Sequence, residues 1–231
     1  MIGEQPLEPT ISFFKQTKKL VNFFETSQKY LYQKGEIILR DGDMPSGIYY
    51  IEKGFVKVYS LQLDGSENLH VILVPGEVFP RNWILGNYYE HVSFEAITPV
   101  VLRRKTRQSF IALLDSDKDA IREVFKMSID FMDVLINRIE NLEFTTSYPR
   151  VINRLLLFSK RFGQRNGNEV KFAAPLTHTN IANSINMSRE TASRELEKLK
   201  TKNLIEEKNH IITIKDITKL EKELTSYLEQ R

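Results

Sequence analysis

Polar side chains with complementary hydrogen-bonding chemistry are concentrated in residues 188–197 of this 231-residue chain. Arginine can donate two hydrogen bonds to guanine O6 and N7, glutamate can accept from cytosine N4, and a hydroxyl can contact a base edge or a phosphate. At the start of a helix, such groups could enter the major groove of DNA. The group comprises Arg189, Glu190, Ser193, Arg194 and Glu197. The simpler alternative is a solvated ion pair between Glu190 and Arg194, worth about 0.3 kcal/mol.

Two short helices around a tight turn are predicted to position this group. We expect Thr177 to cap the first helix and Ser188 to cap the second. Asn186 falls at the turn, where a positive φ is needed and asparagine tolerates it. The predicted buried positions are Ile181, Ala182, Ile185, Ala192, Leu196 and Leu199. Small alanines on both helices allow the close approach of a helix-turn-helix.

A two-stranded wing is predicted behind the second helix, because residues 204–214 alternate and turn at Lys208, Asn209 and His210. The tip of this wing could touch the sugar-phosphate backbone. We therefore place Thr177, Ser188 and Lys208 with Arg189, Glu190, Ser193 and Arg194 as candidate DNA-binding residues.

The charge distribution favours the same end of the chain. Lys and Arg number 33 against 30 Asp and Glu, a net charge of +3. The first 146 residues carry 17 basic and 20 acidic residues, whereas residues 147–231 carry 16 and 10. An acidic front half and a basic back half indicate that the C-terminal part meets a polyanion.

The absence of cysteine excludes disulfides, cysteine-ligated zinc, iron–sulfur clusters and thiol chemistry. The apolar runs are far shorter than the roughly 18 residues that span a bilayer. The N-terminus lacks the basic and apolar regions of a signal peptide. We expect a cytoplasmic protein without a membrane partner.

The front half has the texture of an all-β roll. Residues 11–26 have helical spacing and predict a short lead-in helix, and residues 30 to about 114 form short β-rich runs with regularly spaced glycine turns. We interpret the basic run Arg103, Arg104, Lys105 and Arg107 as a solvated strand end.

A heptad seam follows the roll and predicts a long helix from about residue 117. The seam consists of Ile121, Phe125, Ser128, Met132, Leu135, Ile139 and Leu142. We expect it to form a parallel homodimer interface, the alternative being a helix packed on its own domain. Pro149 predicts a break at residues 147–149, since proline disfavours helical geometry in the preceding residue, and the hinge is expected near residues 144–149. A helix from Arg150 to Gly163 and a polar loop at 164–168 are expected next.

The pattern LTxxxIAxxIxMSRETxSRxLxxLxxxxLI with its wing resembles the winged helix-turn-helix of the Crp/Fnr family of bacterial transcription regulators. Upstream, KGEIILRDGD, YYIEKGFVKVY, DGSE and PGEVF resemble the family's cyclic-nucleotide-binding-like β-roll. The resemblance covers about residues 13–215. It implies an α+β fold with an N-terminal jelly-roll-like β-roll (11–116), a dimerisation helix (117–146) and a winged helix-turn-helix (147–231).

The cyclic-nucleotide anchors of the family are replaced here. Members that bind cyclic AMP hold the ribose with a Glu and the phosphate with an Arg followed by Ser or Thr. By alignment, Arg81 replaces that acid, and Glu90 with His91 replaces the Arg-Ser pair. A carboxylate repels the phosphate, so cyclic AMP is not expected. The degenerate effector pocket would comprise Gly76, Glu77, Arg81, Trp83, Glu90 and His91, in which Arg81 either pairs with Glu90 or, like it, faces solvent.

The signal therefore stays open at this point. Haem through His70 or His91 is not expected, because a single histidine on a strand is more often structural. Trp83, Tyr88 and Tyr89 could line a pocket for another small molecule or fill it, and regulation without an effector is equally compatible.

We expect a regulator and not an enzyme. A cupin-like enzyme would need an HxH metal motif, which His70 and His91 lack, and a third alternative is a signalling roll with a merely structural helix-turn-helix. The resemblance implies a homodimer that binds double-stranded DNA and contacts RNA polymerase. Glu190, Ser193 and Arg194 match members that read TTGAT-like half-sites, whereas Arg189 matches members that read TGTGA-like half-sites.

Overall fold

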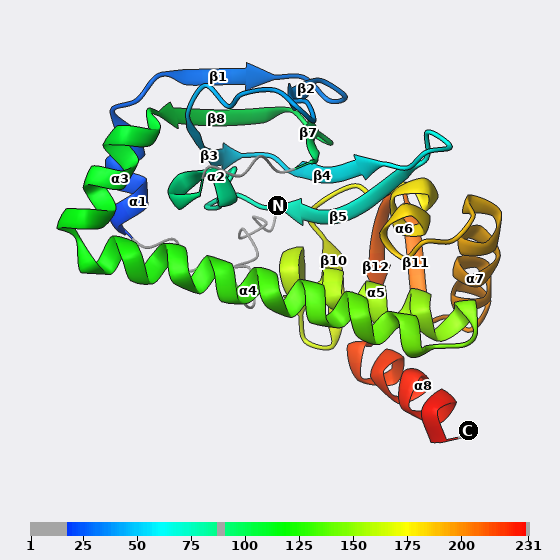
Figure 1. Cartoon of the computed structure of the whole chain (residues 1–231). Helices are drawn as coiled ribbons and strands as arrows, with labels where there is room; N and C mark the ends of the chain where they lie inside the picture. Colours follow the sequence, from blue (N-terminus) through cyan, green and yellow to red (C-terminus); the bar gives the residue numbers. More distant parts are fainter. Residues whose placement is uncertain (1–17, 87–90, 230–231) are drawn as a thin grey trace, which may run out of the picture. The chain divides into compact units, whose positions relative to one another are not determined.

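The computed structural model describes residues 18–86 and 91–229 (Figure 1). The chain forms two compact units that divide between Val134 and Leu135. The first contains most of the β-structure, and the second contains a helix-turn-helix beside a small sheet. The α+β class predicted from the sequence is confirmed.

The first unit is a roll of two four-stranded antiparallel sheets. One sheet has the order β1 (Lys29–Tyr32), β8 (Val100–Lys105), β3 (Ile48–Lys53), β6 (Val78–Phe79). The other has the order β2 (Ile37–Leu39), β7 (Ser93–Ala96), β4 (Val56–Leu61), β5 (Glu67–Leu73). Gly54 has a φ of 87° in the turn between β3 and β4, where an added Cβ would also collide with the Pro99 carbonyl.

Stacked aromatic rings fill the inside of this roll. The Phe79 ring lies 4.8 Å from that of Phe94 and 5.3 Å from that of Tyr49, both in stacked geometry. All three side chains are at most 4% exposed. Burial of three large rings supplies much of the apolar surface that holds the two sheets together.

Three helices pack against the roll: α1 (Lys18–Glu25), α2 (Asn82–Leu85) and α3 (Arg107–Ser116). With the start of α4 (Lys118–Glu143) they share one core, made of Leu20, Phe24, Ile48, Tyr50, Val78, Ile84, Phe110, Leu114, Ala120 and Met127. The β-rich texture expected up to about residue 114 was thus wrong for α3, which begins at the Thr106 cap. Of the lead-in helix predicted over 11–26, residues 11–17 lie outside the described residues.

The basic run at the end of β8 is not a solvated strand end. The Arg103 guanidinium donates to Glu52, to the carbonyl of Glu25 at the end of α1 and to the carbonyl of Ser27 just after it. Arg107 donates to the carbonyls of α2 and Gly86, at 2.8 Å for Trp83. These cations satisfy backbone groups that a helix leaves unpaired at its C-terminus.

The second unit contains α5 (Ser147–Phe162), α6 (His178–Ser184), α7 (Arg189–Thr201) and α8 (Ile217–Glu229) around one antiparallel sheet. The sheet order is β11 (Ile205–Lys208), β12 (Ile211–Ile214), β10 (Glu169–Phe172), β9 (Gly163–Asn166). The predicted loop at 164–168 is therefore mostly a β-hairpin, with only its turn at 167–168.

The interruption lies within the hinge predicted near residues 144–149, but the break expected at residues 147–149 falls inside a helix. Helix α5 begins at Ser147 after the Thr146 cap, and the interruption falls at residues 144–146. Pro149 is the third residue of α5, where the backbone N–H that it lacks would have no partner within the helix. Proline is thus compatible with the first turn.

Candidate nucleic-acid interface

Helices α6 and α7 form the predicted helix-turn-helix. Thr177 caps α6 through a capping box, in which its Oγ1 accepts from the Asn180 backbone N–H and the Asn180 side chain accepts from the Thr177 N–H. Asn186 has a φ of 51° in the turn. Ser188 caps α7 by accepting from the Thr191 backbone N–H at 3.1 Å. The predicted caps and turn are confirmed.

The apolar faces of the two helices are buried as the sequence predicted. The six residues Ile181, Ala182, Ile185, Ala192, Leu196 and Leu199 are all at most 3% exposed. The opposite face of α7 begins with three exposed charged side chains, Arg189, Glu190 and Arg194. The first turns of this helix therefore present two guanidiniums and one carboxylate to solvent.

Arg194 is held at one end and free at the other. Its Nε lies 3.6 Å from Glu195 Oε1, while 64% of its side chain is exposed. Glu195 is itself 3% exposed and also accepts from Ser147 and Lys198. Burial raises the pKa of Glu195, but these partners outweigh burial and lower it overall. The Arg194 side chain thus extends from an anchored, ionised carboxylate.

Two arginines of α5 donate hydrogen bonds to backbone carbonyls next to the turn. The sequence did not predict these contacts. Arg154 donates to the Ser184 carbonyl at 2.7 Å, and Arg150 donates to the Ile185 carbonyl. Both acceptors lie at the C-terminal end of α6, where cations are favourable. Burial, assisted by the Arg138 charge, lowers the pKa of Arg154 to about 9. The position of Arg154 among the buried apolar residues Val151, Leu155 and Phe158 is the signal that could have indicated its role.

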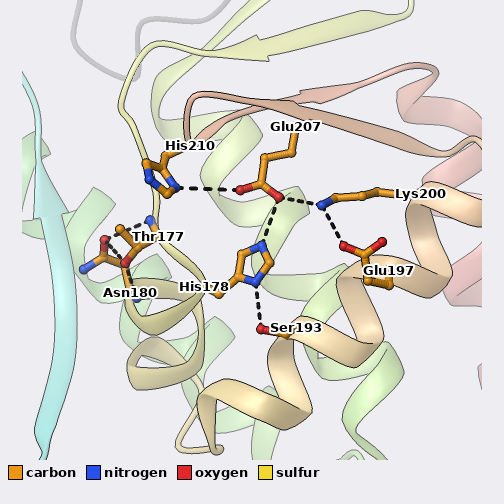
Figure 2. Close-up of polar contacts among 8 residues, drawn as sticks. All are labelled: Thr177, His178, Asn180, Ser193, Glu197, Lys200, Glu207 and His210. Carbon is orange, nitrogen blue, oxygen red and sulfur yellow. Dashed lines mark hydrogen bonds and ion pairs between the residues drawn. The ribbon is translucent and has the colours of Figure 1, made fainter.

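A polar network behind α7 was also missed by the sequence analysis (Figure 2). His178, the first residue of α6, has its Nδ1 2.7 Å from Ser193 Oγ and its Nε2 2.9 Å from Glu207 Oε2. Lys200 bridges Glu207 at 2.7 Å and Glu197 at 2.9 Å. Ser193 is half-buried, so this candidate base contact is engaged within the chain. The network ties α6 and α7 to wing strand β11.

The wing turns where the sequence predicted. Asn209 and His210 both have positive φ, at 52° and 62°, as in a two-residue hairpin turn. Lys208 is exposed as the last residue of β11. This places one cation next to the wing tip.

The helix-turn-helix unit and the roll both match known families. Residues 149–223 match the Crp-like helix-turn-helix domain, and residues 30–117 match the cyclic nucleotide-binding domain. The chain belongs to the Crp/Fnr family of transcription regulators. The sequence resemblance is confirmed.

Curated relatives of this Crp/Fnr chain include a cAMP-activated regulator and a regulator of nitrogen fixation. It is 26% identical over 165 residues to a CRP-like cAMP-activated global transcriptional regulator of Mycobacterium tuberculosis (strain ATCC 25618 / H37Rv), covering 71% of this chain and 74% of that protein. It is 25% identical over 174 residues to the nitrogen fixation regulation protein FixK of Rhizobium meliloti (strain 1021), covering 75% and 76%.

Solved Crp/Fnr structures share the fold. FixK2 from Bradyrhizobium japonicum aligns with a TM-score of 0.72 at 23% identity, over 85% of this chain and 96% of that chain. A CooA mutant from Carboxydothermus hydrogenoformans aligns with a TM-score of 0.73 at 19% identity, over 89% and 94%.

The α4 seam of this Crp/Fnr regulator faces away from its own chain. Ile121, Phe125, Met132, Leu135, Ile139 and Leu142 are between 37% and 66% exposed. Ser128 is half-buried and donates to the Val124 carbonyl at 3.0 Å. A different face of α4 is the buried one, with Glu123, Met127, Asp130, Val134 and Asn141. A long exposed apolar stripe of this kind is typical of an interaction surface.

The predicted effector pocket is only partly assembled. Gly76 has a φ of 97° before Glu77, whose side chain is 1% exposed and accepts from the Val74 N–H at 2.8 Å. Arg81 Nη1 lies 3.8 Å from Glu77 Oε1 and 3.4 Å from the Val78 carbonyl, and its guanidinium carbon is 5.2 Å from the Phe131 ring centre.

Trp83 and His91, also predicted for this pocket, have contacts of their own, and Glu90 is not described. Trp83 packs partly buried against the core of the roll, with the Arg107 guanidinium 5.4 Å from its ring centre. His91 has 81% of its side chain exposed, with Asp41 at 3.4 Å. Tyr88, Tyr89 and Glu90 lie outside the described residues, so the proposed pairing of Arg81 with Glu90 stays a prediction.

Two further observations concern the described part of the chain only. It contains no group of three His, Asp or Glu side chains arranged to hold a metal ion. None of its helices is both long and apolar enough to cross a membrane.

Proposed function

We propose that this Crp/Fnr regulator is a homodimer that reads a pseudo-palindromic DNA site with TTGAT- or TGTGA-like half-sites. The observation that carries this proposal is the exposed start of α7, with Arg189, Glu190 and Arg194 on a correctly capped recognition helix. Arginine matches guanine O6 and N7, and glutamate matches cytosine N4. Because Arg194 is held at Nε by Glu195, its terminal nitrogens are the ones available for a bidentate contact.

Contacts to the DNA backbone would fix the register of this helix. Lys208 on the wing supplies an exposed cation for a phosphate. The Thr177 and Ser188 hydroxyls already donate to Asn180 and Thr191. Their own phosphate contacts would therefore replace hydrogen bonds of the caps.

The α4 seam supports the dimeric state. A two-fold dimer presents two recognition helices to half-sites about one helical turn apart, or ~34 Å. The exposed apolar side chains on α4 would be buried in such a dimer. RNA polymerase is included as a partner on the strength of the family relationship.

The effector is proposed to be something other than cyclic AMP, or absent. Glu77 already lies beside the Arg81 cation, and Glu90 stands in the sequence where the cyclic-AMP-binding members carry their phosphate-binding Arg. A cyclic phosphate would thus enter a cassette without a free cation at that position.

The experiment is a fluorescence-anisotropy titration of the full chain with duplexes that carry TTGAT-type or TGTGA-type palindromes, and with a scrambled duplex. We expect tight binding to one of the palindromes. Arg194→Ala should lose about 1–3 kcal/mol on that palindrome and nothing on scrambled DNA.

Lys208→Ala is the matched comparison on the wing. We expect it to weaken binding to every duplex alike and to reduce the salt dependence by about one ion. Equal affinity of the unaltered chain for palindromic and scrambled DNA would refute the proposal and favour a signalling roll with a structural helix-turn-helix.

A further inference from the structure

The Ser193 hydroxyl forms a hydrogen bond within its own chain. Ser193 lies on α7, one residue before Arg194, and its Oγ is 2.7 Å from His178 Nδ1. The His178 side chain is 22% exposed, and its other nitrogen lies 2.9 Å from Glu207 Oε2. Figure 2 shows the imidazole placed between the two.

The chemistry of the partners determines which nitrogen carries a hydrogen. Burial raises the pKa of Glu207, but hydrogen bonds from Lys200 and His178 outweigh burial and lower it overall. An ionised carboxylate only accepts hydrogen bonds, so His178 Nε2 must be the donor. In a neutral imidazole Nδ1 is then the acceptor, and the Ser193 hydroxyl must donate to it.

A serine hydroxyl has one hydrogen and two lone pairs. With its hydrogen committed to His178, Ser193 can offer only lone pairs to the major groove. Adenine N6 and cytosine N4 donate there, whereas guanine O6 and N7 and thymine O4 only accept. His178 therefore influences which base Ser193 prefers without contacting the DNA itself.

We propose that His178 is a specificity-determining positioning residue, which makes Ser193 select a base with an amino group at its position in the half-site. This inference rests on the proposed DNA-reading function. It adds a half-buried determinant to the exposed residues of α7.

The charged groups around His178 come from three elements. Glu207 on β11 contacts it directly, Lys200 and Glu197 on α7 lie behind Glu207, and His210 in the wing turn has its Nδ1 3.9 Å from Glu207 Oε1. Among these, Glu207 fixes the orientation of the imidazole through its hydrogen bond to Nε2, and Lys200 positions Glu207 through an ion pair.

The test is selection of randomised half-sites by the full chain, followed by titration of duplexes that differ at one base pair. Ser193→Ala identifies the base pair that Ser193 reads. His178→Asn keeps an oxygen near Nδ1 and should retain the amino preference. His178→Gln reaches toward Glu207 but leaves Ser193 without an acceptor, and should reduce the preference by about five-fold.

Three controls separate this role from a structural one. Melting temperatures of all variants report folding, and discrimination at the base pair read by Arg194 should stay unchanged. In a Ser193→Ala background, His178→Gln should have no further effect on base preference.

The assignment is overturned if His178→Gln retains the full preference, if His178→Asn and His178→Gln lose it equally, or if Ser193→Ala changes no base preference. An unaltered chain without any sequence preference would instead overturn the proposed function, and this assignment with it. If the unaltered chain still discriminates at the base pair read by Arg194, a negative result for His178 overturns only the assignment to His178, and the proposed function stands.

Discussion

The Arg81 guanidinium lies 3.8 Å from the carboxylate of Glu77, a side chain that is only 1% exposed. Both residues come from the segment that resembles the nucleotide-binding cassette of the family. The chain thus places its own anion beside the cation that replaces the ribose-binding acid. We propose that this ion pair, together with the carboxylate of Glu90 in the sequence, makes the cassette unsuited to a cyclic phosphate.

Cyclic AMP is therefore expected to leave this regulator unchanged. A ligand present at 100 times its dissociation constant stabilises the folded state by about 2.7 kcal/mol, which a thermal melt detects readily. We expect no shift in melting temperature and no change in DNA affinity with ~1 mM cyclic AMP. Isothermal titration calorimetry provides the direct check, and a saturable heat would contradict the prediction.

The helix-turn-helix could be predicted because its signals are local. The Thr177 and Ser188 caps lie within three residues of the backbone groups that they satisfy, and Asn186 determines the turn by its own φ. The heptad seam is likewise readable from spacing along one helix. Such features depend on neighbours in the chain and survive in the structure.

The network around His178 could not be predicted because its members meet only through the fold. Ser193 lies 15 residues from His178, and Glu207 lies 29 residues away. The helix break expected at Pro149 was wrong for a related reason, since proline is unfavourable inside a helix but compatible with its first turn. Its effect depends on where the helix begins, and α5 begins at Ser147.

Asn186→Ala should destabilise the helix-turn-helix by about 1 kcal/mol, because alanine lacks the short polar side chain that lets asparagine tolerate the left-handed region. Asn186→Gly should stay close to the unaltered chain, since glycine adopts this conformation freely. Chemical denaturation measures both. Equal losses in the two variants would show that the Asn186 side chain, and not its φ of 51°, supports the turn.

Ile139→Asp should dissociate the proposed dimer. Ile139 is 64% exposed on the α4 seam, so it adds little to the isolated chain. Burying it in both copies would contribute about 3–6 kcal/mol to association, so the dissociation constant should rise at least ~100-fold. Sedimentation equilibrium measures this.

Lys126→Asp is the control for the dimer, since Lys126 is exposed on α4 outside the seam. It introduces the same carboxylate without removing an apolar contact, and should remain dimeric. If Ile139→Asp also stays dimeric, the seam is not the interface. Loss of palindrome binding together with the dimer would link the two halves of the proposal.

Glu207→Gln should weaken the dependence of the folding stability on pH in the acid range. The pKa of Glu207 is raised by burial but lowered overall by hydrogen bonds from Lys200 and His178, to below its ordinary 4.5. The ionised carboxylate thus stabilises the folded state fully above pH 4.5 and progressively less as the pH falls through the lowered folded-state value. Glutamine cannot titrate, so the variant should be about 1–3 kcal/mol less stable near neutral pH and converge on the unaltered chain in acid. Melting temperatures at a series of pH values measure the convergence.

Glu169→Gln, at an exposed position on β10, should follow the unaltered chain throughout. Parallel curves for Glu207→Gln and the unaltered chain would mean that Glu207 holds the wing by shape and not by charge.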